Sequence, residues 1–117
     1  MMKIDISEFG NVGTKITLVG KLDIVGAEKV DLPLATAAGT RRNIVVDMSG
    51  VGFIASPGIR HLVMAAKTVA NGSRKLVLLD PSPMVTAMLL TLGLDDVLPI
   101  VRSEDEARAV FAGTANV

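Results

Sequence analysis

The sequence predicts a single α/β domain, in which a mixed β-sheet of about five strands packs with about four helices. A chain of 117 residues has the length of one globular domain. Half of its residues are apolar and 21% are charged, a balance that can bury a core and argues against disorder. After an initial pair of strands, segments with strand and helix patterns alternate, as in an antiparallel hairpin followed by right-handed βαβ crossovers. We expect the domain to span residues 1–113 and residues 114–117 to form a frayed tail.

The first two strands are predicted to form an antiparallel hairpin. Ile4 and Ile6 alternate with polar residues, as in a half-buried strand. Residues 10–13 supply the turn, and the second arm covers residues 15–19 and closes at Gly20.

Two helices and a buried strand are predicted next. Apolar residues recur at helical spacing over residues 26–38, and Pro33 indicates either a kink or a late start for this helix. The β-branched run at residues 43–48 is typical of a central strand. Residues 59–70 place apolar side chains on one helical face, and Gly72 suits the end of that helix.

The remaining crossover is predicted from a strand at residues 75–79 and a helix at residues 85–92. Ser82 precedes this helix and Gly93 follows it, with Leu94 placed for the apolar contact of a Schellman motif.

The C-terminal part is predicted to contain a short strand at residues 97–101 and a last helix. Ser103 and Glu106 have the spacing of a capping box, and the helix is expected to end near Phe111.

Composition argues against several classes of partner and chemistry. Twelve basic and twelve acidic residues cancel without forming runs, and only three residues are aromatic, so neither nucleic acid nor an anionic membrane surface is an expected partner. With no cysteine and His61 as the single histidine, no metal site and no cofactor is expected. No apolar run is long enough for membrane insertion and no signal peptide is present, which predicts a cytoplasmic protein.

Ser56 is the strongest candidate for a functional residue. Pro57 suits the first position of the following helix and favours an extended conformation for the residue before it, which predicts Ser56 as the helix N-cap. The amides of Gly58 and its neighbours, the helix dipole and Arg60 would favour a phosphate on this hydroxyl. A plain capping role is the alternative, and helix geometry alone does not decide between them.

Four stretches of the chain carry a family resemblance. They are Leu22-Asp23, IVVDMSGVGFIASPGI at residues 44–59, KLVLLDP at residues 75–81 and VTAMLLTLGLDD at residues 85–96. Together they resemble the STAS domain, and more narrowly the single-domain bacterial anti-sigma factor antagonists. The resemblance covers nearly the whole chain and implies the STAS-like form of the fold described above.

The resemblance also implies a function. In that family a partner that is both anti-sigma factor and GHKL-type serine kinase phosphorylates a serine, and a PP2C-type phosphatase reverses the reaction. Only the unphosphorylated form binds the partner and releases the sigma factor, so a binding protein rather than an enzyme is expected. The phosphorylated position corresponds to Ser56 and a loop acid to Asp23, whereas the aspartate of the family motif is replaced by Ala55 and the serine or threonine that follows the phosphorylated position is replaced by Pro57. The residues implied in partner binding are Asp23, Ser56, Pro57, Gly58 and Arg60.

Other interpretations are weaker. The altered motif leaves open a STAS subunit that docks on a transporter or another membrane complex without phosphorylation. A hydrolase built from Ser56 and His61 is disfavoured, because a histidine five residues along the same helix points away from its N-cap. Asp47 is expected to end the central strand in a structural role, since the acidic pair of a phosphate-receiving domain is missing.

Three apolar residues fall outside the best core stripes. Such residues more often fill gaps in the core than serve partners. They are Met64, Met84 and Leu90.

Overall fold

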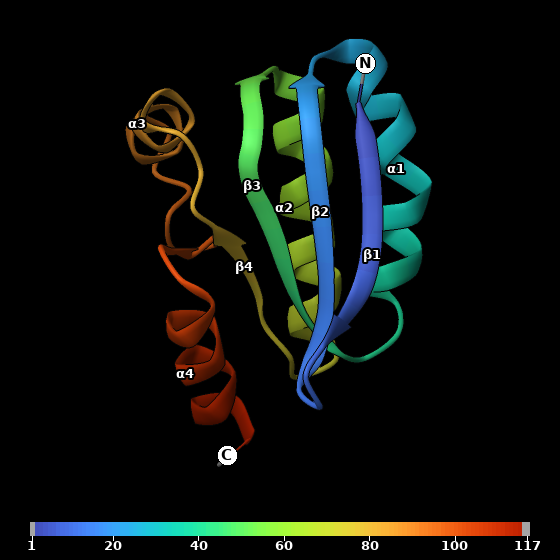
Figure 1. Cartoon of the computed structure of the whole chain (residues 1–117), viewed down its shortest axis with the longest axis vertical. Coiled ribbons are helices and arrows are strands. Elements are labelled where there is room, and N and C mark those ends of the chain that lie inside the picture. The colour runs from blue at the N-terminus through green and yellow to red at the C-terminus, as the bar shows by residue number, and fades with distance from the viewer. Residues whose placement is uncertain (1, 116–117) are drawn as a thin grey trace.

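The computed structural model describes residues 2–115 and contains one five-stranded mixed sheet with four helices (Figure 1). The strands lie in the order β1-β2-β3-β4-β5, with β1 and β2 antiparallel and the remaining neighbours parallel, which confirms the predicted fold class. Along the chain the elements are β1 (Lys3–Phe9), β2 (Gly13–Leu22), α1 (Ile24–Ala38), β3 (Asn43–Ile54), α2 (Ser56–Asn71), β4 (Leu76–Leu79), α3 (Pro83–Thr91), β5 (Ile100–Val101) and α4 (Glu104–Ala115).

Two apolar clusters hold the helices to the sheet. The larger one joins α1, α2 and α3 to one sheet face, and Figure 1 shows α1 and α2 behind β1, β2 and β3. The smaller one joins α4 to the other face through Ala107 and Phe111, which pack with Val45 and Val77. In this cluster the rings of Phe9 and Phe111 meet edge to face, with centroids 5.9 Å apart.

The central strands are longer than the sequence pattern predicts. β3 was expected to end at residue 48 and β2 at residue 19, but their parallel pairing continues to Leu22 and Ile54. Two register shifts carry the pairing past Gly20 and past the glycines of β3, where the sequence pattern indicates the end of a strand. Asp47 therefore lies in the middle of β3 rather than at its end.

The first helix also differs from its prediction. α1 begins at Ile24 and continues through Pro33 as one helix. Pro33 removes only the backbone donor that would bond to the Lys29 carbonyl, and a capped start with several buried apolar residues offsets that loss.

The ends of the last elements confirm some predictions and correct others. α3 closes with the predicted Schellman motif, because Gly93 has a φ of 69° and the Leu94 amide donates to the Leu89 carbonyl at 3.0 Å. β5 contains only Ile100–Val101, since residues 95–97 turn instead of extending. α4 continues to Ala115, past the expected end near Phe111, and residues 116–117 of the expected tail lie outside the described part of the chain.

An ion pair connects the start of α4 to the sheet. The Lys15 ammonium donates to Glu104 at 2.8 Å and lies 3.8 Å from the Asp47 carboxylate. The hydrogen bond between Lys15 and Glu104 lowers the pKa of Glu104 and raises the pKa of Lys15. The pair therefore stabilises the fold between the acid range, where Glu104 becomes protonated, and the alkaline range, where Lys15 loses its proton.

We expect Glu104→Gln to lower the free energy of unfolding at neutral pH by about 0.2–1 kcal/mol, the usual worth of a partly exposed ion pair. Because the folded pKa of Glu104 is depressed, the difference from the wild type should shrink as the pH falls through that pKa. Urea denaturation between neutral and acidic pH measures it. Glu28→Gln is the matched control, since Glu28 is exposed on α1 and has no ion pair within residues 2–115. A difference that persists unchanged in acid would contradict the ion-pair explanation.

Candidate functional site

The candidate site lies where β2 and β3 end side by side. Leu22 and Ile54 are the last paired residues of the two strands, and the Ala55 amide donates to the Leu22 carbonyl at 2.9 Å. α1 begins two residues after Leu22, and α2 begins two residues after Ile54. This one joint therefore places Asp23 and Ser56 at the same edge of the sheet, as expected for residues that follow neighbouring parallel strands.

Two glycines allow both helices to start so close to the end of β2. A Cβ on Gly58 would lie 2.6 Å from the Leu22 Cγ, and a Cβ on Gly26 would overlap the Lys21 carbonyl oxygen. Since real Cβ atoms essentially never approach so closely, Gly26 and Gly58 are required by packing. The predicted role of Gly58 in partner binding thus rests on a residue that is itself buried.

The predicted N-cap role of Ser56 is wrong by one position. The N-cap is Ala55, with the extended angles φ −112° and ψ 167°, and Ser56 and Pro57 are the first two helical residues. The bond from Ala55 to Leu22 keeps Ala55 extended, and the Ile59 amide makes the first helical bond back to the Ala55 carbonyl at 3.1 Å. Proline is tolerated at the second position, because no donor in the first turn has a partner within the helix.

The side chain of Ser56 is exposed and does not cap α2. Within residues 2–115 its hydroxyl has no hydrogen-bond partner, and no side chain caps α2. The amides of Ser56 and Gly58 are therefore free at the positive end of the α2 dipole, while Arg60 is exposed one turn further on. This surrounding is favourable for an anionic group on the Ser56 oxygen.

Asp23 has the capping role that Ser56 lacks. Its Oδ1 accepts a hydrogen bond of 2.8 Å from the Gly26 amide, and the residue is half-buried at the N-cap of α1. A structural role for Asp23 is thus present whether or not the carboxylate also contacts a partner.

Two other sequence candidates are not part of this site. The His61 Nδ1 faces Asp31 of α1 at 3.6 Å, so this imidazole is directed toward α1 rather than toward the Ser56 hydroxyl. Asp47 accepts hydrogen bonds from the Ser49 amide at 3.0 Å and the Ser49 hydroxyl at 2.7 Å, which agrees with its predicted structural role.

Exposed apolar side chains surround the joint, and the sequence analysis missed them. Ile24 and Val25 in the first turn of α1 are 64% and 62% exposed, and Phe53 near the end of β3 is 43% exposed. We call Ile24, Val25 and Phe53 the apolar rim. Their place within three residues of the Leu22–Ile54 pair was the available signal, but all three lie outside the predicted strands and helices, so no residue pattern pointed to their exposure.

The three apolar residues outside the core stripes are also on the surface. Packing was the favoured interpretation, yet Met64 and Met84 are each 59% exposed and Leu90 is 53% exposed. The buried apolar residues of α2 and α3 fill the space against the sheet, so Met64, Met84 and Leu90 are not needed there.

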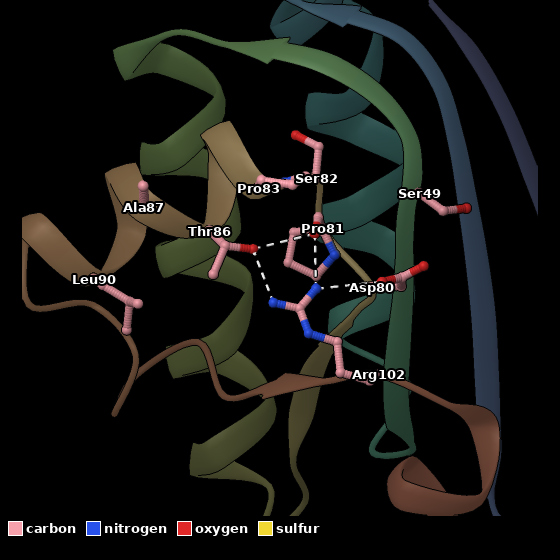
Figure 2. A pocket seen from close by; sticks show the side chains of 9 residues that line it. All are labelled: Ser49, Asp80, Pro81, Ser82, Pro83, Thr86, Ala87, Leu90 and Arg102. Carbon is pink, nitrogen blue, oxygen red and sulfur yellow. Dashed lines mark hydrogen bonds and ion pairs between the residues drawn. The ribbon is translucent and has the colours of Figure 1, made fainter.

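A separate hollow of about 630 Å³ lies between α3 and the ends of β4 and β5 (Figure 2). Arg102 crosses it and donates to the Pro81 carbonyl at 2.9 Å, the Asp80 carboxylate at 3.2 Å and the Thr86 hydroxyl at 3.2 Å. These bonds tie β5 to the start of α3, and Arg102 was not singled out from the sequence because its partners are distant along the chain.

Neither a metal site nor a membrane span emerges from the described residues. Among residues 2–115 no group of three or more acidic or histidine side chains is placed to hold a metal ion. Over the same part of the chain, no helix has the length and apolar character needed to cross a bilayer.

A family model described as the STAS domain matches residues 3–107, which is most of the chain. The chain belongs to the STAS domain family. This STAS domain is 27% identical over 95 residues to BtrV of Bordetella bronchiseptica, a protein provisionally named as an anti-sigma factor antagonist, with 80% of this chain and 82% of BtrV covered.

Solved structures share the STAS fold with this chain. An anti-sigma factor antagonist from Mycobacterium paratuberculosis is 17% identical and has a TM-score of 0.85, with 96% of this chain and 95% of that chain covered. The Bacillus cell fate determinant SpoIIAA in its phosphorylated form is 19% identical and has a TM-score of 0.71, with 92% of this chain and 99% of that chain covered.

We expect Ala55→Asp to raise the free energy of unfolding by about 0.5–2 kcal/mol, because the new carboxylate would cap α2 as Asp23 caps α1. Asp23→Ala should lower it by a similar amount, and Asp23→Asn should change it little, since asparagine also caps. Urea denaturation compares the three variants. If Asp23→Ala is destabilising while Ala55→Asp has no effect, the start of α2 is not limited by its missing cap.

Proposed function

We propose that this STAS domain is a cytoplasmic anti-sigma factor antagonist, a binding protein rather than an enzyme. In its unphosphorylated form it binds an anti-sigma factor that is also a GHKL-type serine kinase, and the sigma factor is released. Phosphorylation of Ser56 switches it off, and a PP2C-type phosphatase restores it. The observation that carries the proposal is an exposed serine whose hydroxyl has no hydrogen-bond partner among residues 2–115, at the start of an uncapped helix and close to the apolar rim.

The names of similar proteins support the proposed partner class. BtrV carries a provisional name as an anti-sigma factor antagonist, and SpoIIAA has been solved in unphosphorylated and phosphorylated forms. Ser56, Asp23 and the apolar rim all lie within three residues of the Leu22–Ile54 pair that ends the β2–β3 ladder, and we take them as one partner-binding surface. That surface offers apolar contact area around a single hydroxyl, which suits recognition of an unmodified serine by a protein partner.

The proposed switch acts at the interface rather than on the fold. A phosphate adds a charge of roughly −1.5 to −2, and the free amides of α2 and Arg60 stabilise it in the unbound protein. A partner surface shaped for a neutral hydroxyl would bury that charge unpaired. The cost is on the order of 3–5 kcal/mol, which corresponds to a hundred- to a few thousand-fold loss of affinity.

We expect a partner kinase with Mg-ATP to phosphorylate Ser56 alone. Ser82 and Ser103 are both engaged as helix caps, with their hydroxyls accepting from Val85 and Glu106. Mass mapping of the reacted protein locates the phosphate, with Ser56→Ala as the unreactive control. Label on Ser82 or Ser103 with Ser56 unmodified would overturn the assignment. If no kinase of the host modifies the chain, the transporter-type alternative replaces this proposal.

We expect Ser56→Asp to fold normally and to bind the anti-sigma partner much more weakly, while Ser56→Ala binds constitutively. Titration calorimetry measures the affinities and circular dichroism the folding. Phe53→Ala should weaken binding of the anti-sigma partner and change the free energy of unfolding little, because the Phe53 side chain is 43% exposed. Equal affinities of the wild type and Ser56→Asp would refute the electrostatic switch.

A further inference from the structure

We propose that α3 is a self-association surface, through which two copies of this chain pair antiparallel about Ala87. This inference concerns a face that the proposed function does not use. In Figure 1, α3 lies at the outer edge of the molecule, beyond β4, whereas α1 lies near β1 at the other edge, so another chain can reach α3.

The first support is the charge pattern. Residues 81–94 contain no charged residue, whereas α1, α2 and α4 each carry both charged and apolar positions. Amphipathic helices that bind membrane surfaces carry lysine or arginine on their polar face, and α3 has none. A protein surface without charge best fits α3, because any charge buried against it would lack a partner. A second α3 supplies such a surface.

The second support is the arrangement of the exposed residues. Val85 and Leu89 are buried against the sheet, which places Ala87 at the centre of the outward face at 100° per residue. Figure 2 shows Thr86 turned toward Arg102, with Ala87 and Leu90 farther out on α3. The exposed residues on the two sides of Ala87 are Pro83 and Leu90 on one side and Met84 and Thr91 on the other.

A two-fold axis through Ala87 makes this face complementary to itself. In an antiparallel pair the two Ala87 residues meet at the crossing point, where a small side chain allows the helices to approach closely. Met84 of each copy then lies against Thr91 of the other copy, and Leu90 lies against Pro83. Antiparallel packing also opposes the two helix dipoles favourably. The exposed Met84 and Leu90 thereby become buried.

The pair should be weak. One nine-residue helix with its flanks forms a contact below the about 1,200–2,000 Å² that stable complexes bury. We therefore expect a concentration-dependent monomer–dimer equilibrium with a dissociation constant in the micromolar range or above.

Sedimentation velocity of the full chain over a wide concentration range tests the proposal. The wild type should shift toward a dimer as concentration rises, and Ala87→Glu should weaken association at least about tenfold, because two like charges would be buried at the axis. Leu32→Glu is the matched control, since Leu32 is 74% exposed on α1 and should leave association unchanged. Circular dichroism confirms that both variants fold.

Cysteine cross-linking tests the geometry, and the chain has no native cysteine to interfere. Ala87→Cys should form a covalent dimer on mild oxidation, since residues at the crossing point lie within the Cα distance of about 4.4–6.8 Å that a disulfide spans. Met84→Cys should not, because the two positions would be about 9 Å apart along the antiparallel helices.

Three outcomes would overturn the proposal. They are a wild type that stays monomeric at every concentration, an Ala87→Glu variant that associates like the wild type, and cross-linking of Met84→Cys but not Ala87→Cys. An Ala87→Glu variant that loses only binding to the anti-sigma partner would assign α3 to that partner instead. Phosphorylation of Ser56, measured in the same variants, tests the proposed function independently.

Discussion

The structure around the site depends on the parallel pairing of β2 with β3 up to Leu22 and Ile54. The bond from the Ala55 amide to the Leu22 carbonyl closes this ladder and holds the residue before α2 in an extended conformation. The end of this ladder determines where both helices begin, because Asp23 directly follows the last extended residue of β2 and Ser56 directly follows the extended Ala55. Gly26 and Gly58 then determine how tightly the helices approach the strand. The exposure of Ser56 is thus a consequence of backbone pairing rather than of its own contacts.

Much of the fold could be predicted from residue patterns, since alternation, β-branched runs and helix caps are local signals. The cap at Ser103 and the Schellman motif at Gly93 were correct, because a few neighbouring residues determine each of them. The predicted length of β3 was wrong. Glycines usually end a strand, but those of β3 lie within the hydrogen-bonded ladder with β2, which continues past them. Tertiary pairing overrode local propensity at that point.

The site shows the same limit. Asp23 and Ser56 could be placed at one sheet edge from the order of strands and helices. The exact residue at which α2 begins could not be predicted. The hydrogen bond from the Ala55 amide to the distant Leu22 carbonyl keeps Ala55 extended and makes it the N-cap, and no local sequence signal indicates that bond. The apolar rim was also hidden, since an exposed isoleucine and a buried one look alike in an apolar pattern. The role of Arg102 could not be predicted either, because its three hydrogen-bond partners lie 16 or more residues away along the chain.

The uneven lengths of the sheet's ladders have a consequence for local opening. β2 and β3 are paired along nearly their whole length, but β3 and β4 share four residue pairs and β4 and β5 only two. The C-terminal third is therefore held mainly by side-chain packing and by bonds such as those of Arg102. Amide hydrogens of β5 and the segment around it should exchange with solvent through partial openings that leave the β2–β3 ladder closed. The molecule thus combines a slowly exchanging centre, which carries the Ser56 edge, with a more readily opened flank.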